Sequence, residues 1–183
     1  GGAEAFRELA RHIARGSTVV FLSPELFRDP AKDKGKEKDS SGWLPLANKG
    51  RVTDLPSCIY HKDEWAKRHP IFEGLPCGGL MDYTFYREII GPKAYAGQDA
   101  PAEVVAGGIT ACPGYSSGLF TSVYPLGAGR FVLNTLQIRP NLGASPVAER
   151  LLRNLLRYAA GDASEPLAEL PSDFAGQLKA LGY

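Results

Sequence analysis

The chain has 183 residues, of which 44% are hydrophobic, and this is enough for one ordinary domain with a buried core. Its formal net charge of +1 gives neither a basic surface nor an acidic tail, so charge does not point to a nucleic-acid partner. No apolar run approaches the roughly 20 residues that cross a bilayer, and we expect no membrane partner either. The three cysteines are an odd number at unrelated spacings, which excludes a disulfide framework and leaves the cellular compartment open.

The first elements indicate an α/β protein. Residues 3–15 carry apolar side chains at the spacing of one helical face, and Gly16 ends this predicted helix. Residues 18–22 form a short apolar run, typical of a strand that is covered on both faces of a mostly parallel sheet. Because such a sheet normally begins with a strand, we expect the chain to be a segment of a larger protein whose first strand lies outside it.

The next part of the chain is less regular. Residues 28–42 mix charges of both signs with few apolar residues, which predicts a charged surface loop; the signs nearly cancel, so a docking arm is less favoured. Residues 58–61 are a short strand candidate. The pattern of residues 81–90 fits a helix or a strand, and we expect a loop that leads into a short helix.

The strongest local signals lie between residues 103 and 161. Residues 103–111, 119–126 and 130–138 are strand-like, and the last two are separated by a small-residue turn at 127–129. A helix follows over residues 146–160, with Ser145 as N-cap, Pro146 at the first position and Gly161 after the last turn. Residues 162–183 form a C-terminal extension that contains a short helix at 173–181, and we expect residues 1–183 to be one domain.

Two glycine motifs suggest chemistry but stand in the wrong context. Ser116 lies in a G-x-S-x-G sequence, the pattern of a nucleophile elbow between a strand and a helix. A strand follows it here, and all three histidines precede it, so we expect a loop between strands. Residues 127–129 begin a G-x-G-x-x-G pattern, but Val132 occupies the third glycine position and a strand follows.

Metal binding has little support in the sequence. Cys58 and His61 stand three residues apart, which is a ligand spacing, but a second pair would have to combine His69 and Cys77 without a recognised motif. We expect no metal site and no cofactor.

Acid/base catalysis has no specific signal either. Asp63 with Glu64, or Asp82 with Glu88, would suit catalysis only at a defined separation that a sequence does not show. We expect exposed surface carboxylates and no catalytic residue.

The candidate ligand site combines the loop at residues 81–86 with the end of the strand at 134–137. Asp82, Tyr83 and Tyr86 offer an acceptor and aromatic faces, and Asn134 and Gln137 offer amides, which together suit a sugar. Ligands of α/β sheets gather beyond the carboxyl ends of strands, where Asn134 and Gln137 lie. The alternative is that the aromatic rings fill the core and the amides satisfy neighbouring backbone groups.

Three stretches resemble a known family. Residues 69–75, HPIFEGL, resemble the H-P-I-x-x-G-L element of trehalose-utilisation-like proteins, whose domains are similar to class I glutamine amidotransferases. Residues 127–136 and 146–160 resemble the end of the amidotransferase-like domain that some bacterial glycoside hydrolases carry, including beta-galactosidase-like enzymes of family 2. The resemblance implies a flavodoxin-like α/β fold, a mostly parallel sheet with helices on both faces, as an accessory part of an enzyme of carbohydrate metabolism.

The resemblance does not extend to amidotransferase chemistry. That activity needs a cysteine on a G-x-C-x-G elbow and a later H-x-E pair, so that the imidazole activates the thiol. Cys112 lies in TACPG and Cys58 in PSCIY, and no histidine is followed two residues later by glutamate. No catalytic residue is therefore transferred.

The sequence predicts a non-catalytic accessory or oligomerisation domain of a beta-galactosidase-like glycoside hydrolase. Its expected partner is a catalytic domain in the same chain, with a second copy of the chain or a carbohydrate as further partners. The alternative is a small stand-alone hydrolase that acts on a carbohydrate derivative, and a third possibility is an oligomerisation module without a ligand. Fold resemblance does not choose among them.

Overall fold

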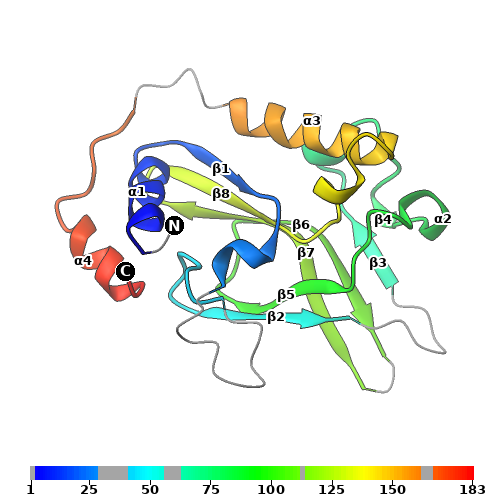
Figure 1. Cartoon of the computed structure of the whole chain (residues 1–183), viewed down its shortest axis with the longest axis horizontal. Helices are drawn as coiled ribbons and strands as arrows, with labels where there is room; N and C mark the ends of the chain where they lie inside the picture. Colours follow the sequence, from blue (N-terminus) through cyan, green and yellow to red (C-terminus); the bar gives the residue numbers. More distant parts are fainter. Residues whose placement is uncertain (1–2, 29–40, 56–62, 112–113, 162–166) are drawn as a thin grey trace.

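The computed structural model describes residues 3–28, 41–55, 63–111, 114–161 and 167–183 (Figure 1). Most of the predicted charged loop at 28–42 and the whole strand candidate at 58–61 lie outside these residues. The helices are α1 (Ala3–Ala14), α2 (Tyr83–Tyr86), α3 (Pro146–Ala160) and α4 (Phe174–Ala180), and the 3-10 turns are η1 (Pro24–Phe27), η2 (Pro70–Phe72) and η3 (Arg139–Asn141). The strands are β1 (Thr18–Phe21), β2 (Lys49–Asp54), β3 (Asp63–Ala66), β4 (Gly79–Leu80), β5 (Lys93–Gln98), β6 (Glu103–Thr110), β7 (Ser116–Leu126) and β8 (Gly129–Asn134).

The strands form one mixed sheet in the order β1-β8-β7-β6-β3-β4, with β5 paired to β7 and β2 paired to β5. Strand β1 runs parallel to β8, and Thr18 lies opposite Arg130. The other pairs are antiparallel. Within the described residues, the sheet therefore contains a single parallel pair.

The prediction of a mostly parallel, flavodoxin-like sheet is wrong. The apolar run at residues 18–22 does form a strand, but β1 stands at one end of the strand order and pairs with β8 alone among the described strands. An apolar run reports burial on both faces of a strand and carries no information about the direction of its neighbours. Here the direction is set by tight connections such as the turn between β7 and β8, which returns the chain antiparallel.

Two irregularities bend the centre of the sheet. Along the β6–β7 ladder, Val104 lies opposite Ser122 and Ala106 opposite Thr121, so Val105 is an extra residue in β6. Gly107 then lies opposite Leu119, which leaves Phe120 as an extra residue in β7. Both extra side chains are buried in the larger core cluster. The bulges therefore turn one side chain of each strand into the core while the ladder continues on either side of them.

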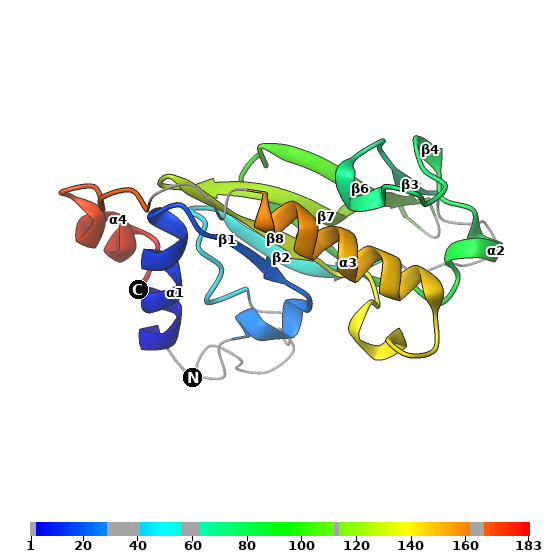
Figure 2. The ribbon, with the colours of Figure 1, turned by 90° about the horizontal axis from the view of Figure 1, so that it is seen from above.

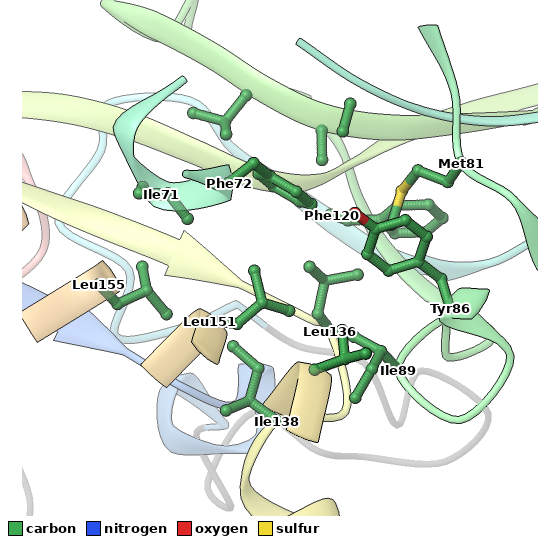
Figure 3. Close-up of a cluster of buried hydrophobic side chains, with 14 of the residues drawn as sticks. Ile71, Phe72, Met81, Tyr86, Ile89, Phe120, Leu136, Ile138, Leu151 and Leu155 are labelled. Atoms are coloured by element: carbon green, nitrogen blue, oxygen red, sulfur yellow. The ribbon is translucent and has the colours of Figure 1, made fainter. Parts of the chain in front are cut away.

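Helix α3 covers one face of the sheet, as its sequence predicts. Its buried residues are Val147, Ala148, Leu151, Asn154 and Leu155. Figure 3 shows Leu151 and Leu155 pointing toward Ile71, Leu136 and Ile138. Strand β8 contributes Val132 to this cluster. Its neighbours Phe131 and Leu133 point to the opposite face of the sheet, because side chains alternate along a strand.

The opposite face is covered by α1 and η1. Ile13 of α1 and Phe27 of η1 pack with Phe21, Phe131 and Leu133, and the rings of Phe21 and Phe27 lie 4.6 Å apart. A third cluster joins α1 to α4 through Ala10, Ala14, Phe174 and Leu178, which confirms the predicted helix in the C-terminal extension. In both views α1 and α4 lie together at one end of the molecule and α2 at the other (Figures 1 and 2). No helix among the described residues is long and apolar enough to span a membrane.

The packing of α3 gives a direct test of the fold. Leu155 is 1% exposed in the larger core cluster, whereas its neighbour Leu156 is 58% exposed. We expect Leu155→Ala to lower the free energy of unfolding by roughly 2–5 kcal/mol, because it removes buried methyl groups and leaves a cavity. The matched control Leu156→Ala should change it by less than about 1 kcal/mol. Denaturant unfolding measures both, and equal losses in the two variants would contradict the observed orientation of α3.

Candidate functional site

The predicted ligand residues on α2 divide between the surface and the core. Asp82 is the N-cap of α2, and its Oδ1 accepts a hydrogen bond of 2.8 Å from the backbone N–H of Thr84. Tyr83 is exposed, whereas Tyr86 is fully buried and its hydroxyl donates to the carbonyl of Pro76. Burial raises the pKa of Tyr86, so this hydroxyl stays protonated. Asp82 and Tyr83 are therefore open to a ligand, and Tyr86 packs in the core (Figure 3).

The two predicted amides lie close to backbone groups. Asn134 is fully buried; its Nδ2 donates to the carbonyl of Leu136 at 2.9 Å, and its Oδ1 accepts from the Thr121 hydroxyl at 3.1 Å. Gln137 is part-buried, and its Nε2 lies 3.5 Å from the Thr135 carbonyl. These bonds stabilise the chain where it leaves β8. Asn134 thus has a packing role in this structure, and only Gln137 of the two amides reaches solvent.

The loop and the strand end are nevertheless neighbours. The backbone N–H of Gln137 donates to the carbonyl of Ile89, three residues after α2, at 2.7 Å. Asn141 adds a bond of 2.8 Å to the carbonyl of Glu88. The structure thus brings together the segments that the sequence predicts to meet, but Tyr86 and Asn134 face inward and the five side chains do not form one exposed surface.

The remaining sequence motifs do not build a reactive site in the described residues. Ser116 is the first residue of β7 and lies opposite Thr110 of β6, so it sits in a sheet ladder and not on a strand-to-helix elbow. Cys58, His61 and Cys112 lie outside the described residues. Within those residues, no group of three or more His, Cys, Asp and Glu side chains is placed to hold a metal ion.

A polar cluster that the sequence did not predict lies beside α3. We call His69, Glu103, Arg130 and Tyr158 the Glu103 cluster. The carboxylate of Glu103 receives a 2.7 Å bond at Oε2 from His69 Nε2 and a 2.6 Å bond at Oε1 from the Tyr158 hydroxyl. The Arg130 guanidinium lies 3.7 Å from Oε1 and 4.6 Å from the centre of the Tyr158 ring. One carboxylate therefore ties together η2, β6, β8 and α3.

The position of His69 follows from its local sequence. His69 is the N-cap of η2, with Pro70 at the first position of the turn, and its Nδ1 accepts the N–H of Ile71 at 3.2 Å. Because Nδ1 accepts, the proton of the neutral ring is assigned to Nε2, which donates to Glu103. The same turn is held to α3 by Asn154, whose Nδ2 donates to the carbonyls of Ile71 and Glu73 at 3.0 and 2.9 Å.

These bonds change the acidity of Glu103. Partial burial alone would raise the pKa of its carboxyl group, but the hydrogen bonds from Tyr158 and His69, with the charge of Arg130 nearby, outweigh it. The pKa of Glu103 is therefore held below its ordinary value, and the group is an anion at neutral pH. A carboxylate in this state is an acceptor and not a general acid.

The cluster cannot be read from the sequence because its members are far apart in the chain. Glu103 stands 34 residues after His69 and 55 before Tyr158, in a segment that signals only a strand. The only local signal for the cluster is that His69 precedes Pro70, an order typical of the start of a turn. The partner of its second nitrogen is fixed by sheet topology, and the topology was predicted wrongly.

No protein-family model matches the chain, and no curated protein sequence gives a significant match.

The Glu103 cluster predicts a defined pH dependence of stability. The pKa of the Glu103 carboxyl group is lower in the folded chain than in the unfolded chain, so the unfolded chain takes up the proton more readily. The stabilisation from the ionised Glu103 is therefore present above about pH 4.5, and it is lost as the pH falls through the folded pKa. We expect Glu103→Gln to lower the free energy of unfolding at pH 7 by about 1–2 kcal/mol, a modest value because the side chain is 38% exposed.

Chemical unfolding at pH 7 and at pH 3 measures the effect. The difference between the wild type and Glu103→Gln should shrink at pH 3, whereas the exposed control Glu169→Gln should remain close to the wild type at both values. A difference that is the same at both pH values would contradict the ionised state assigned to Glu103.

Proposed function

We propose that this chain is a non-catalytic accessory domain of a carbohydrate-active, beta-galactosidase-like glycoside hydrolase. Its role is to pack against a catalytic domain in the same chain, with contacts to a second copy and to carbohydrate as further roles. The link to glycoside hydrolases comes from the resemblance of residues 127–136 and 146–160 to the amidotransferase-like domain of such enzymes, and residues 69–75 resemble the related trehalose-utilisation-like proteins. The observation that supports a non-catalytic role is the bonding of His69.

Both ring nitrogens of His69 are engaged in the folded chain. Nδ1 accepts the Ile71 N–H, and Nε2 bonds to Glu103. A general base needs a free nitrogen within reach of the proton that it removes. The other histidine among the described residues, His12, is exposed on α1 and lies 3.4 Å from Glu8 in the same helix. Neither imidazole is placed as an activating base for Ser116, which is the first residue of β7.

An exposed apolar surface supports the accessory role. Leu80 on β4 and Tyr83 and Phe85 on α2 are all exposed, although each is a large hydrophobic side chain. They lie close together in the chain, at the end of the molecule opposite α1 (Figure 1). Apolar side chains gathered on a surface are a common feature of interfaces between domains. The same end holds Asp82 and Gln137, which remain the proposed polar contacts to carbohydrate.

We expect the purified chain to hydrolyse neither glutamine nor simple esters, because, of the two histidines that the structure describes, His69 has both ring nitrogens bonded and His12 lies beside Glu8 on α1. Assays with glutamine, p-nitrophenyl acetate and p-nitrophenyl β-galactoside test this expectation, with Ser116→Ala and His69→Gln as variants. Activity in the wild type that either variant abolishes would contradict the proposal and favour the stand-alone hydrolase. The reading frame on either side of this sequence supplies the matching test of context: the proposal requires a glycoside hydrolase catalytic domain in the same frame.

A further inference from the structure

A pocket with a volume of 520 Å³ lies at the end of the molecule where α1 stops and the β7–β8 turn begins. Its size falls in the range of small-molecule sites. It is lined by residues from the loop after α1, from the start of β6, from β7 and β8 with the turn between them, and from the C-terminal segment. The charged side chains among them are Arg15, Glu103 and Arg130. The loop after α1, which lines the pocket, lies at the end of the molecule opposite α2 (Figures 1 and 2).

One wall of the pocket carries a fixed pair of opposite charges. Glu103 and Arg130 line this wall. Glu103 accepts hydrogen bonds from His69 and Tyr158. The Arg130 guanidinium lies over the Tyr158 ring, and its Nε donates to the Thr18 hydroxyl at 3.4 Å. Both side chains keep a partly exposed surface, 38% for Glu103 and 29% for Arg130. Polar groups positioned in advance lose little conformational entropy when a ligand binds.

The second cation of the pocket is Arg15, and the structure gives only one of its guanidinium N–H groups a hydrogen-bond partner among the described residues. Its Nε makes a long bond of 3.4 Å to the carbonyl of Ala168. Arg15 is not needed to satisfy the end of α1, because the carbonyl of Ala14 accepts from Ala128 N–H at 2.9 Å and its own carbonyl accepts from Ala168 N–H at 2.7 Å. Its remaining N–H groups are available to a molecule in the pocket.

We propose that this pocket binds a small hydroxy acid, a molecule that carries one carboxylate and several hydroxyl groups, such as a sugar acid. The two guanidinium groups and the one carboxylate give the pocket a net charge of +1, which suits a single anionic group. A guanidinium binds a carboxylate through paired N–H donors, and Arg15 has the free donors for this bond. Glu103 accepts from its two partners and retains lone pairs, so hydroxyl groups of the ligand donate to it. This inference does not depend on the proposed function, because the carbohydrate contacts proposed there, Asp82 and Gln137, do not line this pocket.

The test is a titration of the isotope-labelled chain with glucuronate, followed by amide chemical shifts. Glucose and acetate are the matched probes: the first lacks the carboxylate and the second lacks the hydroxyl groups. We expect saturable shifts at residues 15–16 and 127–130 with glucuronate, and binding at least about tenfold weaker with either probe. Arg15→Gln should weaken glucuronate binding about tenfold. The control Arg87→Gln, an exposed arginine on the far end of the molecule, should leave it unchanged.

Each other outcome overturns the inference. Glucose that binds as well as glucuronate would show that the carboxylate is not recognised, and acetate that binds as well would show a general anion site. The absence of shifts at residues 15–16 and 127–130 with 20 mM glucuronate (roughly the weak limit for a specific small ligand) would show that the pocket is not a binding site. Thermal unfolding of Arg15→Gln confirms that a loss of binding does not come from a loss of the fold.

Discussion

The sheet depends on strand β7, because three other strands are hydrogen-bonded to it. Strand β6 lies along one edge of β7, β8 pairs with residues 121–126 on the other edge, and β5 meets that second edge at Leu119. The extra residues Val105 and Phe120 lie beside the point where the partner of this edge changes from β8 to β5, and such bulges bend a strand locally. Both side chains enter the core under α3, so the bend of the sheet and the packing of the helix are parts of one arrangement.

The Glu103 cluster and Asn154 attach α3 and η2 to this sheet. Asn154 binds two carbonyls of the H-P-I turn, and Glu103 at the start of β6 binds His69 from that turn and Tyr158 from α3. The bonded polar groups of this network stabilise the arrangement, although the buried Oδ1 of Asn154 has no hydrogen-bond partner among the described residues. The imidazole of His69 and the carboxylate of Glu103, 2.7 Å apart, therefore hold η2, β6 and α3 together.

Local elements were predictable from the sequence, and their arrangement was not. The helix at 146–160 agrees in both bounds with α3, because Ser145, Pro146 and the four-residue apolar spacing are all local signals. The hairpin was also predicted, although β8 ends at Asn134 and not at Ile138; Leu136 and Ile138 are apolar because they fill the core after the strand has ended. Strands β2 and β5 have mixed composition and mostly edge positions, and no pattern in the sequence indicated them.

For the candidate site, too, the sequence predicted the residue types but not their arrangement in space. Asp82, Tyr83 and Gln137 remain at least partly accessible, whereas Tyr86 and Asn134 are buried, because residue type predicts the chemistry of a side chain and not the direction in which it points. The Glu103 cluster and the pocket beside it arise from four or more separate segments. Only the three-dimensional order of the strands brings them together, and one sequence does not contain that order in a form that spacing or composition reveals.

Both ring nitrogens of His69 are hydrogen-bonded in the folded chain, and we infer that this histidine has a structural role. The nitrogen chemical shifts of its ring, measured at pH 7.5 in the labelled chain, test this claim most directly. We predict one tautomer, with an unprotonated Nδ1 that is hydrogen-bonded to the Ile71 N–H and a protonated Nε2 that is coupled to Glu103. A ring that carries its proton on Nδ1, or that exchanges rapidly between the two tautomers, would contradict the account and would return His69 to the candidates for catalysis.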